Sequence, residues 1–520
     1  MGKIVIDPIT RIEGHLKIEA IVENGVVKDA RSSGTLFRGF ELILKGRDPR
    51  DAQRYTQRIC GVCPTSHSVA ATLNLDSAFG LADKITDNGR ILRNLILGAA
   101  HIADHILHFY HLAALDYVDV TGILGYNGSD LTMLSVKKFV ERGQLGPFVP
   151  RYEGDYRLSP EINLKALGDY VKALEMRRKA QEMLTIFGGK MPHNMGVIPG
   201  GVACSSPAVD EIASFLWKLN ELRDFIDNVY IPDVLAVAEA YSDYFGIGAG
   251  CGNLLSYGSF DLDGSNLNYL QRDRLLKAGI VSTDLNLKSV DVNKISEYVK
   301  YSWYDQVTTN KGPAEGVTSP QADKQGAYSW IKAPRYDGKV YEVGPLARVV
   351  ATYLSGDSPL KDTVDAVLSR FNAKPAALFS VLGRHAARAI YCKYVADSMQ
   401  GWLLQLKPGE PAYTEYEIPD EATGIGFVDA ARGALLHAVS IKDKKIANYQ
   451  CVVPSTWNLS PRDDMGQPGP VEQALIGTKI KDESNPFEIV RIVRAFDPCI
   501  ACAVHLITPK GRKLAEYKIA

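Results

Sequence analysis

The chain has 520 residues, of which 46% are hydrophobic and 23% are charged, so it is long enough to bury a large core. Its formal net charge of −1 gives no reason to expect nucleic acid or an anionic membrane as a partner. No apolar run reaches the roughly 18–20 residues that span a bilayer. The opening residues, MGKIVIDPIT, alternate like a strand and lack an export signal. We therefore expect a water-soluble chain whose export would depend on a partner's signal.

Hydrophobic periodicity predicts both strands and long helices along the chain. Residues 15–33 alternate between apolar and polar, and Asn24-Gly25 supplies a hairpin turn between two strands. Residues 88–117 show a helical period and are apolar on most sides, which indicates a helix buried in the middle of a large fold. Near the end, residues 433–453 read as two strands joined by a polar turn. Further long helices are predicted at 164–187, 207–245 and 373–405.

Two stretches rich in Pro, Gly and Asp, at 246–290 and 305–345, have the composition of long surface excursions. We find no internal repeat, no low-complexity block and no stretch with the composition of a linker. The sequence therefore predicts one large, mainly helical α+β unit, with a buried bundle of long helices and small peripheral sheets.

Four of the eight cysteines form two C-x-x-C pairs at opposite ends of the chain, Cys60/Cys63 and Cys499/Cys502. Pairs of this spacing bind metal or carry out redox chemistry. The spacing alone leaves three interpretations open, namely a structural zinc site, a thiolate site for a redox-active metal, and disulfide chemistry. The remaining cysteines are scattered, and we expect Cys204, Cys251 and Cys392 to be buried small hydrophobic residues.

The contexts of the two pairs are specific. The first, RICGVCPTSH at 58–67, resembles the N-terminal signature of nickel–iron hydrogenase large subunits, and the second, DPCIACAVH at 497–505, resembles their C-terminal signature. Further blocks occur in the family's order over nearly the whole chain, among them RIEGHLKIE, FRGFE, HFYHLAALD, KAPRY, GRHAAR and VVPSTWN. The resemblance is close to the respiratory uptake type, and it implies the catalytic subunit of an enzyme that cleaves H2 reversibly into protons and electrons.

The resemblance implies a binuclear centre. Cys60 and Cys499 would be terminal nickel ligands, while Cys63 and Cys502 would bridge nickel to an iron that carries CO and two CN ligands. Thiolates suit both metals. Position 499 is cysteine and not selenocysteine, as in the standard nickel–iron type. The iron's diatomic ligands would contact three consecutive residues, Val453, Pro454 and Ser455.

The resemblance also implies roles for residues around the metals. Heterolytic cleavage of H2 releases a proton, and Glu13 would relay it from Cys499. Arg432 would place its guanidinium over the open metal position, and His67 would donate to a bridging sulfur. Two carboxylates, Asp104 and Asp497, would hold the guanidinium by charge-assisted hydrogen bonds.

Two of these positions carry information beyond the resemblance. Asp104 lies in the apolar helix, where an unpaired carboxylate is costly, so a buried partner is expected from the pattern itself. The family usually has proline before the arginine of its PRG motif, whereas this chain has Ala431, which predicts a less rigid loop.

A second metal, Mg2+, is implied near the C-terminus. Its ligands would be Glu41, the backbone carbonyl of Cys451 and the imidazole of His505. The helix at 88–117 also carries His101, His105 and His108, which lie within roughly 60° of one another at 100° per residue. A further metal site and ordinary packing are both compatible with that arrangement, and we favour packing.

The resemblance divides the chain into a catalytic domain, 1–505, and a propeptide, 506–520, removed by a maturation protease after nickel insertion. Electrons would leave through an iron–sulfur small subunit, because this chain has no further cysteine cluster for such clusters. Localisation on the periplasmic side of the membrane, with membrane contact only through partners, is also implied. Two alternatives are the quinone-site subunit of respiratory complex I, which lacks the four cysteines, and a zinc-stabilised scaffold.

Overall fold

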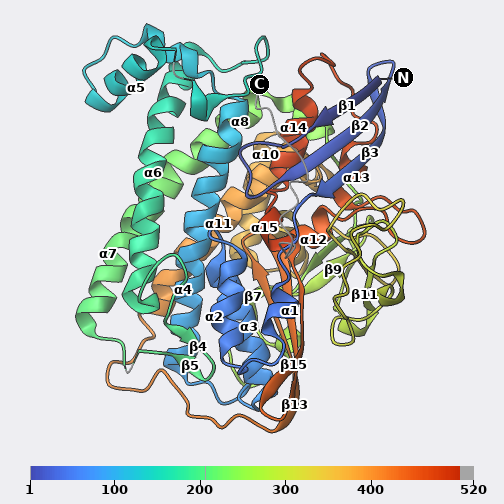
Figure 1. The fold of residues 1–520 in the computed structure, drawn as a ribbon. Helices are drawn as coiled ribbons and strands as arrows, with labels where there is room; N and C mark the ends of the chain where they lie inside the picture. The colour runs from blue at the N-terminus through green and yellow to red at the C-terminus, as the bar shows by residue number, and fades with distance from the viewer. Residues whose placement is uncertain (1, 144, 205, 504–520) are drawn as a thin grey trace.

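In the computed structural model of the chain, residues 2–143, 145–204 and 206–503 are described. The fold is a mixed α+β unit, mainly helical, with small antiparallel sheets around a bundle of long helices (Figure 1). The predicted fold class is thereby confirmed. Within these residues, no helix combines the length and the apolar character needed to cross a membrane.

The helices vary from single turns to the 29-residue α6. The α-helices are α1 Phe40–Leu44, α2 Asp51–Thr56, α3 Pro64–Ala78, α4 Asp87–Ile106, α5 Leu131–Glu141, α6 Pro160–Gly188, α7 Val209–Phe225, α8 Ile231–Ala240, α9 Pro345–Leu354, α10 Ser358–Arg370, α11 Val381–Leu403, α12 Pro454–Asn458, α13 Pro470–Leu475, α14 Phe487–Ala495 and α15 Ile500–Ala503. Two π-helical segments, Leu107–Ala113 and Ile226–Tyr230, continue α4 and α7.

The sheets are small and antiparallel. Their strands are β1 Gly2–Ile6, β2 Leu16–Glu23, β3 Val26–Gly34, β4 Val197–Ile198, β5 Gly201–Val202, β6 Leu254–Ser256, β7 Ser259–Asp261, β8 Arg274–Leu276, β9 Gly279–Val281, β10 Leu287–Lys288, β11 Ile295–Tyr298, β12 Ala333–Tyr336, β13 Glu421–Ala430, β14 Gly433–Lys442 and β15 Lys445–Val452. The three-stranded sheets have the orders β1-β2-β3, β10-β9-β6 and β13-β14-β15, and the pairs are β4-β5, β7-β8 and β11-β12.

The bundle is built around α4, which packs against α6 and α11 (Figure 1). Helix α4 begins at the N-cap Thr86, whose side chain accepts a hydrogen bond from the Gly89 N–H. Nearly all of its side chains are buried, as the apolar pattern predicts. At Gly98 an added Cβ would lie 2.7 Å from the Met399 sulfur, so glycine permits the close approach of α4 and α11.

Helix α3 lies directly on the sheet β13-β14-β15, and two glycines of β13 make this contact possible. A Cβ at Gly424 would lie 2.2 Å from the Asn74 carbonyl oxygen, and one at Gly426 would lie 2.4 Å from the Ala70 carbonyl oxygen. Any side chain at these positions would therefore push α3 away from the sheet. This approach matters for the site, because α3 carries the first cysteine pair at its N-terminus.

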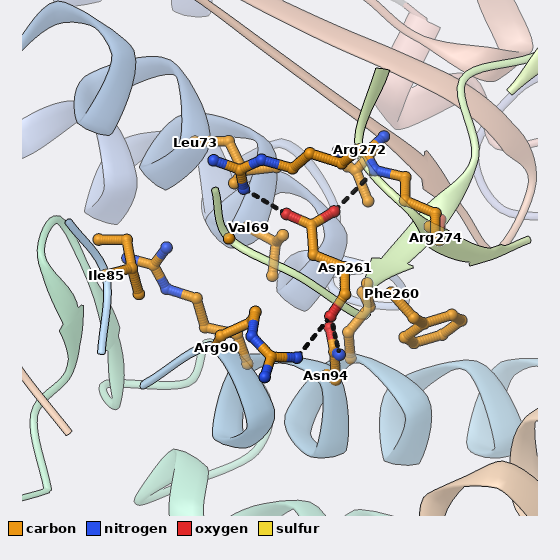
Figure 2. Close-up of a pocket in the computed structure, with 14 residues that line it drawn as sticks. Val69, Leu73, Ile85, Arg90, Asn94, Phe260, Asp261, Arg272 and Arg274 are labelled. Atoms are coloured by element: carbon orange, nitrogen blue, oxygen red, sulfur yellow. Dashed lines mark hydrogen bonds and ion pairs between the residues drawn. The ribbon is translucent and has the colours of Figure 1, made fainter. Parts of the chain in front are cut away.

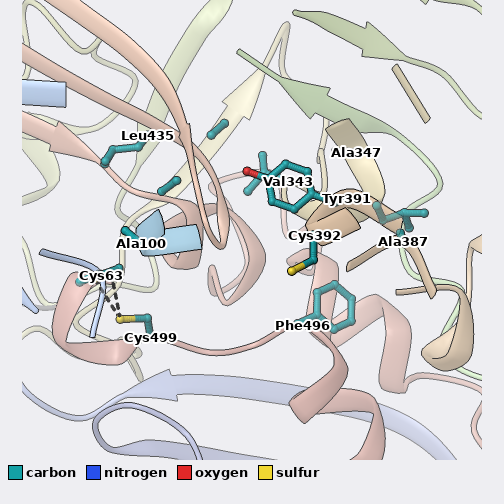
Figure 3. Close-up of a cluster of buried hydrophobic side chains, with 14 of the residues drawn as sticks. Cys63, Ala100, Val343, Ala347, Ala387, Tyr391, Cys392, Leu435, Phe496 and Cys499 are labelled. Atoms are coloured by element: carbon teal, nitrogen blue, oxygen red, sulfur yellow. Dashed lines mark hydrogen bonds between the residues drawn. The ribbon is translucent and has the colours of Figure 1, made fainter. Parts of the chain in front are cut away.

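The two ends of the chain are joined next to the core. After β1 the chain reaches the loop before α15, where Glu13 and Cys499 form a parallel bridge. The Ile500 N–H donates to the Glu13 carbonyl oxygen at 2.8 Å. Figure 3 shows Cys63 and Cys499 beside buried side chains such as Ala100 and Leu435. The cysteine pairs are thus fixed within the fold by backbone contacts between distant segments.

Most predicted elements are present, with differences at their ends. The Asn24-Gly25 hairpin and the β14-β15 hairpin are confirmed. The helix predicted at 373–405 begins only at Val381, because Pro375 starts a separate short turn and Ser380 then caps α11. The helix predicted at 207–245 is interrupted by the π-helical segment Ile226–Tyr230, which ends two residues before Pro232, a residue that lacks an N–H to donate.

The prediction of a surface excursion at 246–290 is wrong for its first part. Strands β6 and β7 lie in the core, where Leu254, Tyr257 and Phe260 are at most 2% exposed. The turn residues that dominate this stretch hid short apolar strands, which are too brief to show a clear period.

Candidate metal centre

Four cysteine side chains from the two ends of the chain meet in the interior. The Sγ atoms of Cys499 and Cys502 are 2.9 Å apart, those of Cys60 and Cys499 are 3.3 Å apart, and those of Cys63 and Cys502 are 3.3 Å apart. All four sulfurs lie within 4.8 Å of one another and are buried. Cys60 and Cys499 are 439 residues apart in sequence, so only the tertiary fold creates the site.

Local backbone geometry presents these sulfurs to one point. Cys63 is the N-cap of α3, and Pro64 at the first helical position is suited to a helix start because its missing N–H is not needed there. The N–H groups of Val62 and Cys63 point to the Cys60 Sγ at 3.2 and 3.4 Å. Asp497, before the second pair, has a positive φ of 55°, which turns the chain inward.

The donor set fits a soft metal. Burial raises the pKa of Cys499 and of Cys502 well above the ordinary value for a thiol. Without a cation these sulfurs would hold protons, so a cation between them is needed to keep all four as thiolates at these separations. Soft sulfur ligands suit nickel, iron or zinc, and the four-sulfur group contains no nitrogen or carboxylate.

Glu13 lies against the second cysteine pair. Its Oε2 is 3.4 Å from the Cys499 Sγ and accepts a hydrogen bond of 2.8 Å from the Ala501 N–H. Burial raises the pKa of Glu13, and the nearby Cys60 raises it further, while the hydrogen bond from Ala501 opposes both. The carboxylate is thus held next to a cysteine sulfur with an increased affinity for a proton.

A buried guanidinium lies on the other side of the cysteines. Arg432 sits in the two-residue turn between β13 and β14, and its Nη2 is 3.0 Å from the Asp497 Oδ1. The two groups form an ion pair without hydrogen-bond alignment, and within the described residues none of the Arg432 side-chain nitrogens has a hydrogen-bond partner. Burying N–H donors without acceptors costs free energy. These N–H groups are therefore available to bind a small ligand beside the sulfurs.

Asp104 is close to this pair but is not part of an ion pair among the residues described. Burial raises its pKa to about 8, and the Arg432 charge partly opposes the shift. The charge-assisted hydrogen bond between Arg432 and Asp104 that the resemblance implies therefore stays a prediction.

The remaining predicted residues fall into two groups. Ser455 accepts a hydrogen bond from the Cys499 N–H at its Oγ, 3.0 Å away, and Val453 is the N-cap of α12, which begins at Pro454. Glu41 accepts a hydrogen bond from the Cys451 N–H at 2.9 Å, and its Oε2 is 4.0 Å from the Lys332 Nζ. His505 and the tail 506–520 lie outside the described residues.

Ala431, in place of the family's usual proline, is fully buried. The Arg348 Nη2 donates to the Ala431 carbonyl oxygen at 3.0 Å and also to the Ala430 carbonyl oxygen. The loop that carries Arg432 is thus anchored through its backbone, independently of the side chain at position 431.

Comparisons with known proteins agree with this geometry. The model of the nickel-dependent hydrogenase family matches residues 38–505, and a second model, described as HoxL-like, matches residues 3–33. The chain belongs to the nickel-dependent hydrogenase family. It is the large subunit of a nickel–iron hydrogenase, an oxidoreductase that acts on H2.

The similarity extends over nearly the whole length of the relatives. The chain is 44% identical over 519 residues to the periplasmic [NiFeSe] hydrogenase large subunit of Desulfomicrobium baculatum, covering 97% of this chain and 95% of the relative. It is 38% identical to the uptake hydrogenase large subunit of Rhizobium leguminosarum bv. viciae, covering 99% and 97%. The solved structure of the reduced Ni-Fe-Se hydrogenase from D. vulgaris Hildenborough superimposes with a TM-score of 0.86 at 45% identity, covering 97% and 100%.

The histidine row of this hydrogenase subunit is used in packing. His101 Nδ1 contacts the Tyr391 hydroxyl, and His108 Nε2 is 2.7 Å from the Arg494 carbonyl oxygen. Burial lowers the pKa of both imidazoles well below the ordinary value, so they are neutral. Among the described residues, the four cysteines are the group with metal-binding geometry, and no histidine joins it.

A separate pocket between α3, α4 and β7 is rich in arginine (Figure 2). Its charges are already matched, because Asp261 pairs with Arg272 and with Arg274, while the Asp261 carbonyl oxygen accepts from Arg90 at 3.0 Å. The pocket therefore stabilises the hydrogenase fold and offers no free cation to an anionic ligand in the part of the chain described.

Sequence reasoning missed two residues near the site, His437 and Tyr449. His437 Nε2 is 3.2 Å from the His67 Nδ1, and His437 Nδ1 is 2.8 Å from the Tyr449 hydroxyl. A signal was present, because a histidine and a tyrosine stand in apolar strands at core-facing positions, where polar side chains need partners.

Proposed function

We propose that the four cysteines hold a nickel–iron centre at which this large subunit cleaves H2 to two protons and two electrons. Cys60 and Cys499 would be the terminal nickel ligands, Cys63 and Cys502 would bridge to iron, and the iron would carry one CO and two CN ligands. The observation that carries the proposal is the group of four buried sulfurs within 4.8 Å, in a chain of this family. When bound, the metal pair supplies the Lewis acid and the electron acceptor for heterolytic cleavage.

Glu13 moves the proton away from the centre. Its Oε2, 3.4 Å from the Cys499 Sγ, receives the proton from that sulfur and passes it outward. The hydrogen bond from the Ala501 N–H keeps this oxygen in place between transfers. Burial supports this role, because it raises the pKa of Glu13 and so brings it closer to that of a thiol.

Arg432 orients the small substrate beside the sulfurs. Its ion pair with Asp497 fixes the direction of the guanidinium, and its unpaired N–H groups supply positive charge to the reaction site. Asp104, on α4, holds the guanidinium together with Asp497, and its electrostatic interaction with Arg432 supports this role. The backbone of Val453 and Pro454 and the Ser455 hydroxyl contact the diatomic ligands, in a segment already bonded to the Cys499 N–H.

A magnesium ion is proposed at Glu41, with the Cys451 carbonyl oxygen and His505 as further ligands. Glu41 is 4% exposed and is anchored to the Cys451 N–H, which supports a fixed oxygen donor. Lys332 balances the local acidic charge by bonding to Glu297 at 3.1 Å.

The partner that carries electrons is an iron–sulfur small subunit. Nickel-insertion factors and a maturation protease act on the chain during its maturation. The protease removes 506–520 and leaves the catalytic domain, 1–505. We place the complex on the periplasmic side, exported with the small subunit. The location is supported by a similar large subunit that is described as periplasmic. The small subunit is supported by the sequence, which has no further cysteine cluster.

Metal analysis of the purified complex, together with the intact mass of this chain, tests the proposal. We expect one nickel per large subunit, one iron in addition to those of the small subunit's clusters, and a chain mass that ends at His505. Zinc alone in a processed chain that still binds its partner would overturn the nickel–iron centre and favour a zinc scaffold. A nickel-free chain that keeps its tail would identify a precursor and support the order of maturation.

A further inference from the structure

His67 is the first member of a chain of buried polar groups that leads away from the cysteines. Its Nε2 is 3.4 Å from the Cys502 Sγ, and its Nδ1 is 3.2 Å from the His437 Nε2. The His437 Nδ1 is in turn 2.8 Å from the Tyr449 hydroxyl. The three side chains are at most 1% exposed, so bulk water does not compete for these hydrogen bonds.

Three elements of the fold hold this chain of groups in place. His67 is on α3, His437 is on β14 and Tyr449 is on β15. Tyr449 pairs with Val439, two residues along β14 from His437, so both rings project from the same face of the sheet. The glycines of β13 that admit α3 to the sheet bring His67 onto this face.

The positions of the hydrogens follow by elimination. A metal-bridging thiolate at Cys502 carries no proton and can only accept a hydrogen bond, so the His67 Nε2 must be the donor. His67 is 1% exposed and its hydrogen bonds in the described residues are to a sulfur and an imidazole, an environment that favours the uncharged ring, whose Nδ1 then accepts. The His437 Nε2 is therefore an N–H donor.

The same argument applies to the next hydrogen bond, between His437 and Tyr449. With a single ring proton, at Nε2, His437 accepts a hydrogen bond at Nδ1, and the donor there is the Tyr449 hydroxyl, 2.8 Å away. A tyrosine hydroxyl has an ordinary pKa of about 10, so it keeps its proton at neutral pH. Every member then donates in one direction, toward the sulfur.

We propose that His437 and Tyr449 are positioning residues that fix the tautomer of His67, so that the His67 Nε2–H is aimed at the Cys502 sulfur. The inference rests on the proposed nickel–iron centre, because that centre is what leaves Cys502 without a proton. A hydrogen bond to a bridging thiolate withdraws electron density from it and raises the reduction potential of the metals. Loss of this relay, the hydrogen bonds from Tyr449 through His437 to His67, thus leaves the metals bound but lowers their reduction potential.

The tautomers can be read directly by solid-state 15N NMR of histidine-labelled complex, in a nickel-loaded state without an unpaired electron. The chain has only ten histidines, and His67→Gln and His437→Gln assign the two of interest by loss of signals. Both rings are expected as the neutral Nε2–H form. A His67 ring protonated at Nδ1 in the nickel-loaded wild type would overturn the proposal, whether or not any variant folds.

Variants test the effect on the metals. Tyr449→Phe and His437→Leu are expected to lower the CO stretching frequency of the iron and the midpoint potential, and to reduce kcat by about tenfold. His437→Gln, whose amide supplies an N–H donor near Nε2, should recover most of the shift. A purely structural role would instead lower the Tm of all three variants alike and leave the frequency unchanged.

A matched control is available in the same core. Tyr391 is a buried tyrosine whose hydroxyl contacts His101, and no cysteine accepts a hydrogen bond from His101 in the described residues. Tyr391→Phe should leave the CO frequency and the His67 signals at their wild-type positions, and equal shifts in the control would contradict the relay. Failure of the hydrogenase proposal would be seen separately, as a processed wild type that lacks nickel.

Discussion

Glu13 and Cys499, 486 residues apart in the chain, lie side by side as a parallel bridge that places a carboxylate oxygen 3.4 Å from a cysteine sulfur. Backbone hydrogen bonds on both sides of Glu13, to Pro498 and from Ile500, fix this relationship. The proton acceptor and the metal ligand are thus held by the same piece of backbone, so neither can shift without the other.

Glu13→Gln should therefore stop proton transfer without dismantling the site. The amide oxygen can still accept from the Ala501 N–H, but it cannot take a proton at the pH of the reaction. We expect H2 oxidation with an artificial dye to fall by about 10²–10⁴-fold. Nickel and iron content should stay at wild-type values, and retained activity would remove Glu13 from the proton path.

Arg432→Lys should lower turnover by about 10²-fold with the metals still bound. Lysine keeps the positive charge, but it offers one point charge where arginine presents a planar fork held by Asp497 at 3.0 Å. Steady-state H2 oxidation measures the loss. If Arg432→Lys matched the wild type, charge alone and not the orientation of the guanidinium would be the requirement.

The raised pKa of Asp104 predicts that the stability of the folded chain depends on pH. Its pKa in the folded chain is about 8, above the ordinary 3.8, so folding takes up a proton between these values. The stabilising contribution of this group is complete below pH 3.8, is lost between pH 3.8 and 8 at about 1.4 kcal/mol per pH unit, and changes no further above pH 8. Asp104→Asn should remove this decline.

Thermal unfolding of wild type and Asp104→Asn between pH 6 and 9.5 provides the measurement. The wild type should lose stability relative to the variant as pH rises from 6 to about 8, and the two curves should run parallel only above that pH. Parallel curves for the two proteins across this range would show that Asp104 is ionised throughout.

Gly426→Ala should separate α3 from its sheet. The new Cβ would lie 2.4 Å from the Ala70 carbonyl oxygen and from the Asn74 nitrogen, both of them backbone atoms that cannot rotate away. We expect a loss of about 3 kcal/mol in stability and poor nickel incorporation. Gly401→Ala on α11, where no atom lies within 4 Å, is the matched control and should be neutral or stabilising.

Glu41→Gln should weaken magnesium binding by about tenfold or more while nickel is retained. The change removes the negative charge from the proposed ligand and leaves Lys332 with Glu297 as its remaining acidic contact. Metal content after dialysis, with both metals measured on the same sample, checks this. A parallel loss of nickel would show that the two metal sites are not independent.

Local features of this protein can be predicted from its amino-acid sequence. The Asn24-Gly25 hairpin, the apolar helix at α4 and the two C-x-x-C pairs are recognisable because their determinants lie within a few residues of one another. The family signatures around Cys60 and Cys499 then identified the hydrogenase large subunit, because such ligand spacing is set by metal chemistry rather than by the surrounding fold.

The tertiary structure alone decided which distant residues meet. The bridge between Glu13 and Cys499, the ion pair of Arg432 with Asp497, and the line from His67 to Tyr449 all join separate elements. Their alignment depends on how closely helices and sheets pack, as at Gly426, and this distance is set by side chains from both surfaces at once. No short window of sequence contains that information, which is why His437 and Tyr449 emerged only from the fold.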